Sequence, residues 1–385
     1  MTKRNTRNRS SQQPLPIGVW VIIAATVLGL YVLQITGAVD LGLFDVEPTP
    51  QAYELQPANA IQVYFTQPRY PDDPESRGSG LDTILASDIA QALASVDVAA
   101  YELDLETVGQ ALVNAHQRGV AVRVLTDSDN VDERAVRQLV RAGIPVSEDN
   151  RSALMHNKFV IIDESVIWTG SWNLTENGTY RNDNNAVRVF SHRLAENYRA
   201  EFEEMFVERR FGPSSPADTP HPTLRIRNQD SSEDLLVETY FAPEDAVADR
   251  ILAAVEGAQE SIRFMAFSFT DDRLGEAIKQ QAKAGLAVQG VFETRGAESE
   301  YGEYGRMSRA RPPLDILLDG NPYSMHHKVV ILDDETVILG SFNFTDSANE
   351  SNDENLLIVH DLDVAARYRA EFERVYAQAA QASSD

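Results

Sequence analysis

The sequence contains no cysteine among its 385 residues. This absence excludes disulfides, cysteine nucleophiles, thiolate zinc sites and iron–sulfur clusters. Positive charge is also scarce, because 34 Lys and Arg residues stand against 59 Asp and Glu residues, giving a formal net charge of −25. Broad electrostatic binding of nucleic acid depends on Lys and Arg, so the composition argues against a general nucleic-acid binder. A small basic pocket is still compatible with such an acidic surface.

The apolar content is sufficient for folded cores. Hydrophobic residues make up 43% of the chain and aromatic residues 8%. These fractions exclude a mostly disordered protein. At roughly 100–200 residues per domain, the length suggests two domains.

One long uncharged run lies near the N-terminus, and its most apolar part extends from Ile17 to Leu33. Four cations precede it: Lys3, Arg4, Arg7 and Arg9. A membrane span needs about 20 mostly apolar residues, and flanking cations stay on the cytoplasmic side. We therefore predict a cytoplasmic segment at 1–14, an uncleaved single-pass signal anchor at 15–36 and a proline-containing tether at 37–60. Cleavage near Thr36-Gly37-Ala38 is the alternative, and it would make the protein secreted.

The remainder of the chain consists of an internal repeat. The nine residues from Met155 to Asp163 match those from Met325 to Asp333 at an offset of 170, and about fifty residues align without a gap. Such a long period indicates a duplicated domain rather than a solenoid. We predict a first repeat at 61–211, a linker rich in Pro, Ser and Thr at 212–233, a second repeat at 234–378 and a tail at 379–385.

Each repeat is predicted to run strand, helix, strand, hairpin and closing helix. In the first repeat these elements are 98–101, 105–118, 120–125, 155–170 and 198–206; in the second they are 262–267, 274–284, 286–292, 325–340 and 365–376. Parallel strands joined by a helix predict an α/β fold with a mixed sheet in each repeat.

The chemistry is concentrated at the two hairpins. His156 and Lys158 share one face of a strand, as do His326 and Lys328, because residues two apart point the same way. The returning strand of each hairpin then brings the motif Gly-Ser-x-Asn, in which the hydroxyl and amide groups are neutral donors: Gly170, Ser171 and Asn173 in the first copy, and Gly340, Ser341 and Asn343 in the second. Doubled, these groups predict a donor-rich pocket suited to a phosphoryl group, with backbone at the glycines close to the ligand.

Asp163 and Asp333 each lie five residues after the lysine of their repeat. An odd separation places them on the opposite face of the strand from the lysine, at the turn of the hairpin. We interpret both as structural residues that cap a turn or accept an internal hydrogen bond.

Two histidines facing one phosphodiester suggest a mechanism without metal or other cofactor. One imidazole attacks phosphorus, and the other, protonated, gives its proton to the leaving alkoxide. A single His-x-Lys is weak support for function. Its repetition with Ser and Asn at the same distances, while apolar neighbours vary, favours a functional site over a repeated core.

This constellation resembles the phospholipase D superfamily, and the resemblance covers about residues 60–378. It implies two similar α-β-α domains related by a pseudo-twofold axis, with one active site between them and a phosphohistidine intermediate. It further implies His156 as the nucleophile and His326 as the general acid, later the base. The phosphate-binding residues that it implies are Lys158, Lys328, Asn173 and Asn343, supported by Ser171 and Ser341.

The first repeat departs from the family's pattern at one position, where family members usually carry an acidic residue that orients a catalytic histidine across the two halves. The second copy supplies Glu354, whereas the first has Asn184 at the matching position. If the pairing is crosswise, Glu354 orients His156 and His326 lacks a carboxylate partner, which favours His156 as the nucleophile. Asp183 is an alternative partner for His326 if the loop shifts by one residue.

The leading expectation for function is a membrane-anchored, extracytoplasmic phospholipase D. It would hydrolyse a phosphatidylcholine-like lipid to phosphatidic acid and an alcohol. A metal-independent nuclease is the second possibility, with Arg306, Arg309 and Arg311 as a basic loop for phosphate contacts. A phosphatidyl transferase of the cardiolipin synthase kind is third, and a non-enzymatic phosphate-binding module is the fourth. One chain holds both half-sites, so we expect a monomer to be functional.

Overall fold

The computed structural model describes residues 60–227, 234–297 and 299–384. The predicted cytoplasmic segment 1–14 and signal anchor 15–36 lie outside the described residues, as does the tether up to residue 59. Within the described ranges, none of the helices has both the length and the apolar character needed to cross a membrane.

The first repeat is built on a mixed sheet. Its seven described strands are ordered β1-β8-β6-β5-β2-β3-β4. They are β1 (Ile61–Phe65), β2 (Ser95–Ala100), β3 (Ala121–Thr126), β4 (Val146–Glu148), β5 (Lys158–Ile162), β6 (Val166–Gly170) and β8 (Asn185–Phe190). Strands β2, β3 and β4 are parallel, whereas β5, β6, β8 and β1 pair antiparallel.

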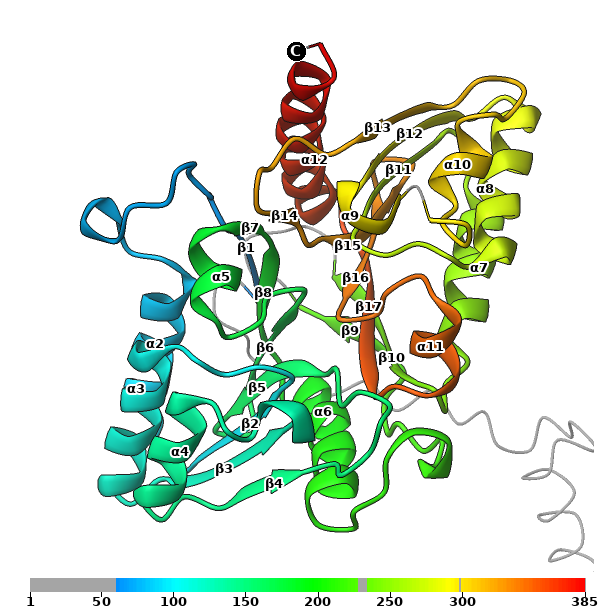
Figure 1. Cartoon of the computed structure of the whole chain (residues 1–385). Coiled ribbons are helices and arrows are strands. Elements are labelled where there is room, and N and C mark those ends of the chain that lie inside the picture. Colours follow the sequence, from blue (N-terminus) through cyan, green and yellow to red (C-terminus); the bar gives the residue numbers. More distant parts are fainter. Residues whose placement is uncertain (1–59, 228–233, 298, 385) are drawn as a thin grey trace, which may run out of the picture. The chain divides into compact units, whose positions relative to one another are not determined.

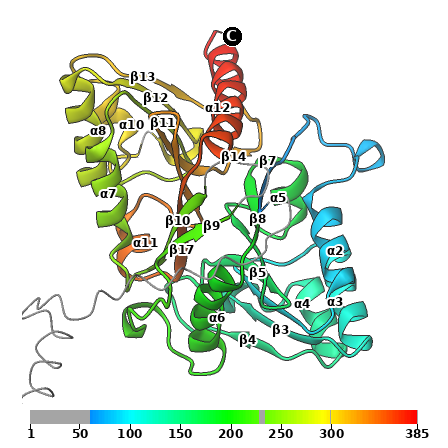
Figure 2. The same ribbon diagram turned by 180° about the vertical axis from the view of Figure 1, so that it is seen from behind.

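The helices of this repeat are α2 (Leu81–Gln91), α3 (Glu106–Gln117), α4 (Arg134–Arg141), α5 (Glu176–Tyr180) and α6 (His192–Phe206), with short 3₁₀ turns at Pro74–Ser76, Ser128–Asn130 and Gly212–Ser214. Both figures show α2, α3 and α4 on the side of the sheet that faces away from the second repeat (Figures 1 and 2). Helix α6 begins after Ser191, whose hydroxyl accepts a hydrogen bond from the Leu194 amide, as an N-cap should.

The second repeat contains the corresponding mixed sheet, in the order β13-β12-β11-β15-β16-β17-β10-β9 among the described residues. Its strands are β9 (Thr223–Ile226), β10 (Leu235–Ala242), β11 (Ser261–Ala266), β12 (Ala287–Phe292), β13 (Asp315–Leu318), β15 (Lys328–Leu332), β16 (Thr336–Gly340) and β17 (Glu354–His360). Its helices are α7 (Val247–Gly257), α8 (Asp272–Ala284), α9 (Thr294–Ala297), α10 (Tyr304–Met307), α11 (Asp346–Glu350) and α12 (Leu362–Ala382). The predicted α/β class with two mixed sheets is therefore confirmed.

The two sheets share a central core. Tyr198 of α6 packs against Phe241 of β10, and Tyr368 of α12 packs against Phe65 of β1, so each closing helix contacts the other repeat. Strands β7 (Asn182–Asp183) and β14 (Ser324–Met325) form a short parallel ladder across the same boundary. Apolar burial and main-chain hydrogen bonds thus hold the two hairpins next to one another.

The structure adds elements that the sequence patterns did not predict. Part of the segment predicted as a linker forms strand β9, which pairs antiparallel with β10. Its residues alternate between exposed and buried, with Leu224 and Ile226 pointing into the core. That two-residue period is typical of an edge strand, and the surrounding proline-rich composition obscured it. Helices α2, α4 and α7 were also not predicted.

Each hairpin turns through two residues with positive φ. In the first copy Asp163 and Glu164 have φ of 50° and 51°, and the Ser165 amide donates to the Ile162 carbonyl, which makes a type I′ turn. The Asp163 carboxylate accepts hydrogen bonds from the main-chain amides of residues 93, 94 and 95, at 2.7–3.2 Å. Asp333 does the same for residues 259, 260 and 261. Both aspartates are structural, as the sequence predicted.

The hydrogen bonds of Asp163 make a stability prediction. Burial raises the pKa of this carboxyl, but three backbone amides outweigh it and hold the pKa below its ordinary value. Asp163→Ala should therefore lower the free energy of unfolding by about 2 kcal/mol, the scale of hydrogen bonds to a charged group. Urea unfolding followed by circular dichroism measures this loss. Glu164→Ala is the matched control, since Glu164 has the same backbone conformation in the same turn; an equal loss in both variants would contradict the prediction.

Candidate active site

The two predicted histidines lie immediately before the hairpin strands, at the boundary between the repeats. The amide of His156 donates to the carbonyl of Asp353, and the amide of His326 donates to that of Asp183, each at 2.9 Å. Each histidine is therefore positioned by main chain from the opposite repeat. Only 6% of His156 and 7% of His326 is exposed.

The side-chain hydrogen bonds of the histidines also run crosswise between repeats. The Nδ1 atom of His156 lies 2.6 Å from Oε2 of Glu354, and Nδ1 of His326 lies 2.9 Å from Oδ1 of Asn184. Glu354 and Asn184 occupy matching positions, so one histidine has a carboxylate partner and the other a neutral amide. In both rings Nε2 is the nitrogen left for a substrate.

Asp183 does not orient His326, so the alternative pairing considered from the sequence is wrong. Its carboxylate accepts from Asn321 at 2.7 Å and forms an ion pair with Arg374. Both partners belong to the second repeat and satisfy Asp183 away from the imidazole.

The two motif serines support the residues that hold the histidines. The Ser341 hydroxyl donates to Glu354 Oε2 at 2.7 Å, and the Ser171 hydroxyl donates to Asn184 Oδ1 at 2.9 Å. Both serines are fully buried. Their hydroxyl protons are committed to these acceptors, so the serines orient Glu354 and Asn184 and are not placed as direct phosphate donors.

The two lysines are buried beside the histidines. Lys158 donates to the main-chain oxygen of His156 at 2.8 Å, and Lys328 to that of His326 at 3.0 Å. Their ammonium groups also lie over aromatic rings, Tyr101 and Phe267 respectively. Burial lowers the pKa of Lys158 to about 7 and that of Lys328 well below its ordinary value. Each ammonium has three donors, so donors remain for an anion, whose charge would restore the protonated state.

Burial also dominates the protonation of the three central groups. It lowers the pKa of His156 well below 6.5, and the charges of both lysines lower it further. The pKa of His326 is lowered in the same way. Burial raises the pKa of Glu354 to about 7, against the lysines and the hydrogen bond from Ser341. The pocket therefore favours neutral imidazoles until it binds an anion.

The two motif asparagines lie in the same region and have unused polar atoms. The Oδ1 atoms of Asn173 and Asn343 are buried and have no hydrogen-bond partner among the described residues. The amide of Asn173 donates to Glu102 at 2.8 Å, a carboxylate that the sequence patterns did not single out. An unpaired buried acceptor carries a desolvation cost that a ligand hydroxyl can relieve by donating to it, whereas phosphoryl oxygens, which accept, would bind the amide N–H groups of these asparagines.

A cavity of about 430 Å³ opens beside His326. The first repeat contributes Glu102, Asn173, Thr175, Asn177, Arg181 and Asn182 to its wall, and the second contributes Phe267, Arg295, Tyr323, Ser324 and His326. It is large enough for a substituent of small-ligand size.

A buried amide network beneath the histidines was missed from the sequence. Asn355 donates to Asn157 at 2.8 Å, and its symmetry-equivalent residue in the first copy, Asn185, contacts His327 at 3.0 Å. Asn157 and His327 directly follow the two catalytic candidates in the sequence, so these hydrogen bonds join the repeats next to the histidines. Asn185 and Asn355 are identical at the 170-residue offset, so the repeat alignment contained this signal.

The motif glycines are required by the packing of the sheets. A Cβ on Gly170 would lie 2.4 Å from the carbonyl oxygen of Asn185, and one on Gly340 would lie 2.2 Å from that of Asn355. The glycines therefore allow close approach of β6 to β8 and of β16 to β17.

The arginine loop offers less positive charge than the sequence suggested. Arg306 is ion-paired with Asp272 and Glu303, and Arg311 donates to main-chain carbonyls of its own loop. This pairing reduces the loop's capacity to neutralise nucleic-acid phosphates.

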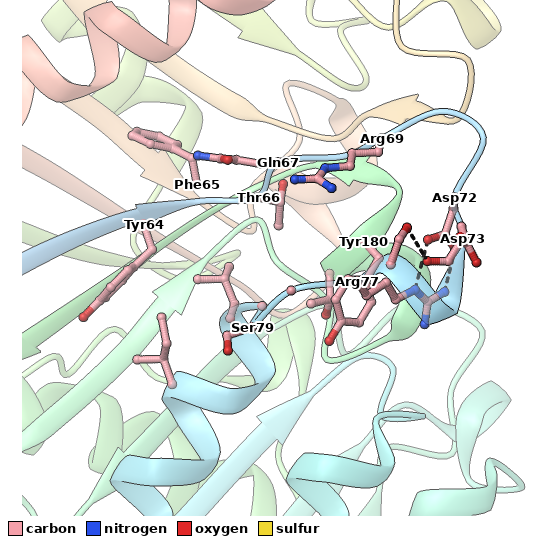
Figure 3. A pocket seen from close by; sticks show the side chains of 16 residues that line it. Tyr64, Phe65, Thr66, Gln67, Arg69, Asp72, Asp73, Arg77, Ser79 and Tyr180 are labelled. Carbon is pink, nitrogen blue, oxygen red and sulfur yellow. Dashed lines mark hydrogen bonds and ion pairs between the residues drawn. The ribbon is translucent and has the colours of Figure 1, made fainter.

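A second cavity, of about 300 Å³, lies beneath the segment between β1 and α2 (Figure 3). Figure 3 shows Arg77 directed toward Asp72, with which it forms an ion pair, and Arg69 on the opposite side. None of the predicted site residues lines this cavity. It is separate from the histidine pocket.

Comparison with known proteins agrees with this geometry. The chain matches the family described as cardiolipin synthase, PLD-like domain, over residues 85–206 and 232–376. A phospholipase D of Rickettsia bellii is 28% identical over 150 residues, 39% of this chain and 74% of the relative. A phospholipase D of Rickettsia conorii is 35% identical over 132 residues, 34% of this chain and 65% of the relative. The mitochondrial cardiolipin hydrolase of Homo sapiens is 30% identical over 134 residues, 35% of this chain and 52% of the relative.

These matches therefore span between 52% and 74% of the curated relatives' length. Among solved structures, the phosphatidylserine synthase of Haemophilus influenzae superposes with a TM-score of 0.59, over 84% of this chain and 87% of that one. At 14% identity this likeness shows a shared fold. The family match covers both repeats and includes both histidine hairpins, so the chain belongs to the phospholipase D superfamily.

Proposed function

We propose that the protein is a phosphodiesterase of the phospholipase D type that hydrolyses the headgroup ester of a phospholipid to phosphatidic acid and an alcohol. The observation that carries this proposal is the crosswise pair of histidines, each held through Nδ1 by the other repeat. Such a pair provides a nucleophile and a proton donor for one phosphorus atom.

In the first step, Nε2 of His156 attacks phosphorus while the bond from phosphorus to the alcohol oxygen breaks. The Glu354 carboxylate accepts a hydrogen bond from the Nδ1–H group of His156, which fixes the tautomer and stabilises the positive charge that develops on the ring. His326, protonated when the anionic substrate is bound, gives its proton to the leaving oxygen. Lys158, Lys328, Asn173 and Asn343 bind the phosphoryl oxygens.

In the second step, water attacks the phosphohistidine and His326 takes a proton from that water. The bond between phosphorus and His156 breaks, which returns both histidines to their starting states. The lack of a carboxylate beside His326 supports this division of roles, because a less basic imidazole is the better proton donor. The two repeats would then act as unequal halves related by a pseudo-twofold axis.

Several features support a lipid substrate. The predicted anchor at 15–36 would hold an extracytoplasmic catalytic region near headgroups, and relatives are named phospholipase D and cardiolipin hydrolase. The net charge of −25 and the pairing of Arg306 disfavour a polynucleotide. A nuclease is the second candidate, and a phosphatidyl transferase is the third, with an alcohol in place of water. A monomer would suffice for any of these reactions.

Denaturation in alkaline detergent during turnover of a substrate labelled on phosphorus should trap the label on His156, because the N–P bond of a phosphohistidine survives base but is hydrolysed in acid. Replacement of the nucleophile removes the covalent route, so His156→Ala should lower kcat by at least about a thousandfold and abolish trapping. Peptide mapping of the labelled protein identifies the residue. His221→Ala is the control, because His221 pairs with Glu196 at the surface, away from the site. Label on His326 would overturn the assignment of roles.

The substrate class is tested by assaying the full-length protein in nonionic detergent on phosphatidylcholine, cardiolipin and single-stranded DNA. We expect release of a lipid headgroup alcohol and little cleavage of DNA. His156→Ala provides the background for each substrate. Cleavage of DNA alone would overturn the lipid proposal and favour the nuclease.

The pH profile of kcat/KM tests the unequal partners of the histidines. Both imidazole pKa values are lowered, so His156 stays a free base and His326 loses its proton at lower pH than an ordinary histidine; we expect an optimum below about pH 6.5. Asn184→Asp adds a carboxylate to His326, which should raise its pKa and move the alkaline limb upward by about one unit. Asn177→Asp, in the same cavity wall, controls for the added charge. A shift of the acid limb instead would contradict the assignment.

A further inference from the structure

The cavity beside His326 differs in charge between its two walls. Both repeats have the same backbone arrangement there. A carboxylate directly after β3 or β12 accepts one hydrogen bond from the turn that follows it and another from the residue before the histidine. In the first repeat Asp127 accepts from the amides of Asp129 and Met155, each at 2.9 Å. In the second repeat Glu293 accepts from the amides of Arg295, at 3.1 Å, and Met325, at 2.7 Å. Arg295 therefore occupies the position of Asp129, with the opposite charge.

The backbone of Arg295 is held in place by a hydrogen bond from its amide to Glu293 and by a tight turn. Arg295 precedes Gly296, whose φ of 84° completes a tight turn, and the neighbouring Thr294 amide donates to Asp319 at 2.8 Å. Among the described residues, no carboxylate forms an ion pair with the Arg295 guanidinium. Arg181, on the opposite wall, is instead ion-paired with Asp72 at 2.9 Å. Of the two arginines among the described residues that line the cavity, Arg295 is the one without an ion-pair partner, so its charge is available to a ligand.

The opposite wall contains a carboxylate. Glu102 follows Tyr101, which packs against the ring of His156, and Ser268 follows Phe267, which packs against the ring of His326. The first repeat therefore has an acid where the second has a neutral hydroxyl. Within this cavity an anionic substituent is repelled near Glu102 and attracted near Arg295. A phosphodiester with one anionic substituent is therefore expected to bind with that substituent against Arg295.

The position of the cavity identifies the part of the substrate that it receives. His326 lines it and His156 does not. Under the proposed mechanism His326 protonates the leaving oxygen, so the cavity receives the leaving alcohol. We infer that the protein selects phospholipids whose leaving alcohol carries an anionic group, and that Arg295 binds this group. The inference rests on the proposed lipid function and deepens it.

Lipids that differ in the charge of the leaving alcohol test the inference on the full-length protein. That alcohol is anionic in cardiolipin, where it is itself a phosphatidyl ester, neutral in phosphatidylglycerol and cationic in phosphatidylcholine. In nonionic detergent micelles at equal mole fraction of lipid, we expect kcat/KM to fall in that order. Arg295→Gln should lower kcat/KM for cardiolipin about tenfold through KM, and change that for phosphatidylcholine by less than about twofold. Arg295→Lys should retain most of the preference.

Arg311→Gln is the matched control for general attraction between the protein and anionic micelles. It removes the same charge from an exposed arginine that donates hydrogen bonds to main-chain carbonyls of its own loop. Equal losses in Arg295→Gln and Arg311→Gln, or equal rates on all three lipids in the wild type, would overturn the inference and leave the lipid function standing. Cleavage of single-stranded DNA without cleavage of any lipid would overturn both.

Discussion

The hydrogen bond between His156 and Glu354 is the interaction on which the candidate site depends. Both groups are buried, and they come from different repeats. A buried carboxylate without a partner is costly, so Glu354 requires the imidazole, the Ser341 hydroxyl and the nearby lysines to be in place. The site therefore exists only when the two repeats are packed together, through the shared aromatic core and the ladder between β7 and β14.

The duplicated architecture produces a site with unequal halves. His156 has a carboxylate partner and His326 has an amide, although the two hairpins are otherwise alike. Further from the histidines, the side-chain charge also differs between matching positions of the two repeats: Asp129 corresponds to Arg295, and Glu102 corresponds to Ser268. A reaction that needs a base on one side of phosphorus and an acid on the other has a physical use for this difference. Sequence differences at a few polar positions can thus assign different catalytic roles to the two halves of an almost symmetric pocket.

Much of the fold and the site could be predicted because the sequence is duplicated. The βαβ units, hairpins and closing helices follow from periodicity, and the pairs His156 and Lys158, and His326 and Lys328, follow from the repeat. The edge strand β9 was missed because its four residues lie in a segment with linker composition. A motif also does not reveal which neighbour approaches its glycine; for Gly170 that neighbour is the Asn185 carbonyl.

The duplicated residue types and their spacing can be read from the amino-acid sequence alone, because strand and helix periods are local properties of the chain. The sequence also shows that Glu354 and Asn184 differ. The packing of the repeats was needed to show which histidine each of them contacts, that Asp183 pairs with Arg374, and that Arg295 lines the cavity beside His326. The contacts of the two histidines and of Asp183 join residues more than a hundred positions apart, so they depend on how the repeats pack. The lack of cysteine excluded thiol and disulfide chemistry, and the excess of acidic residues argued against broad binding of nucleic acid. The packing of the two hairpins then gave each histidine a different partner.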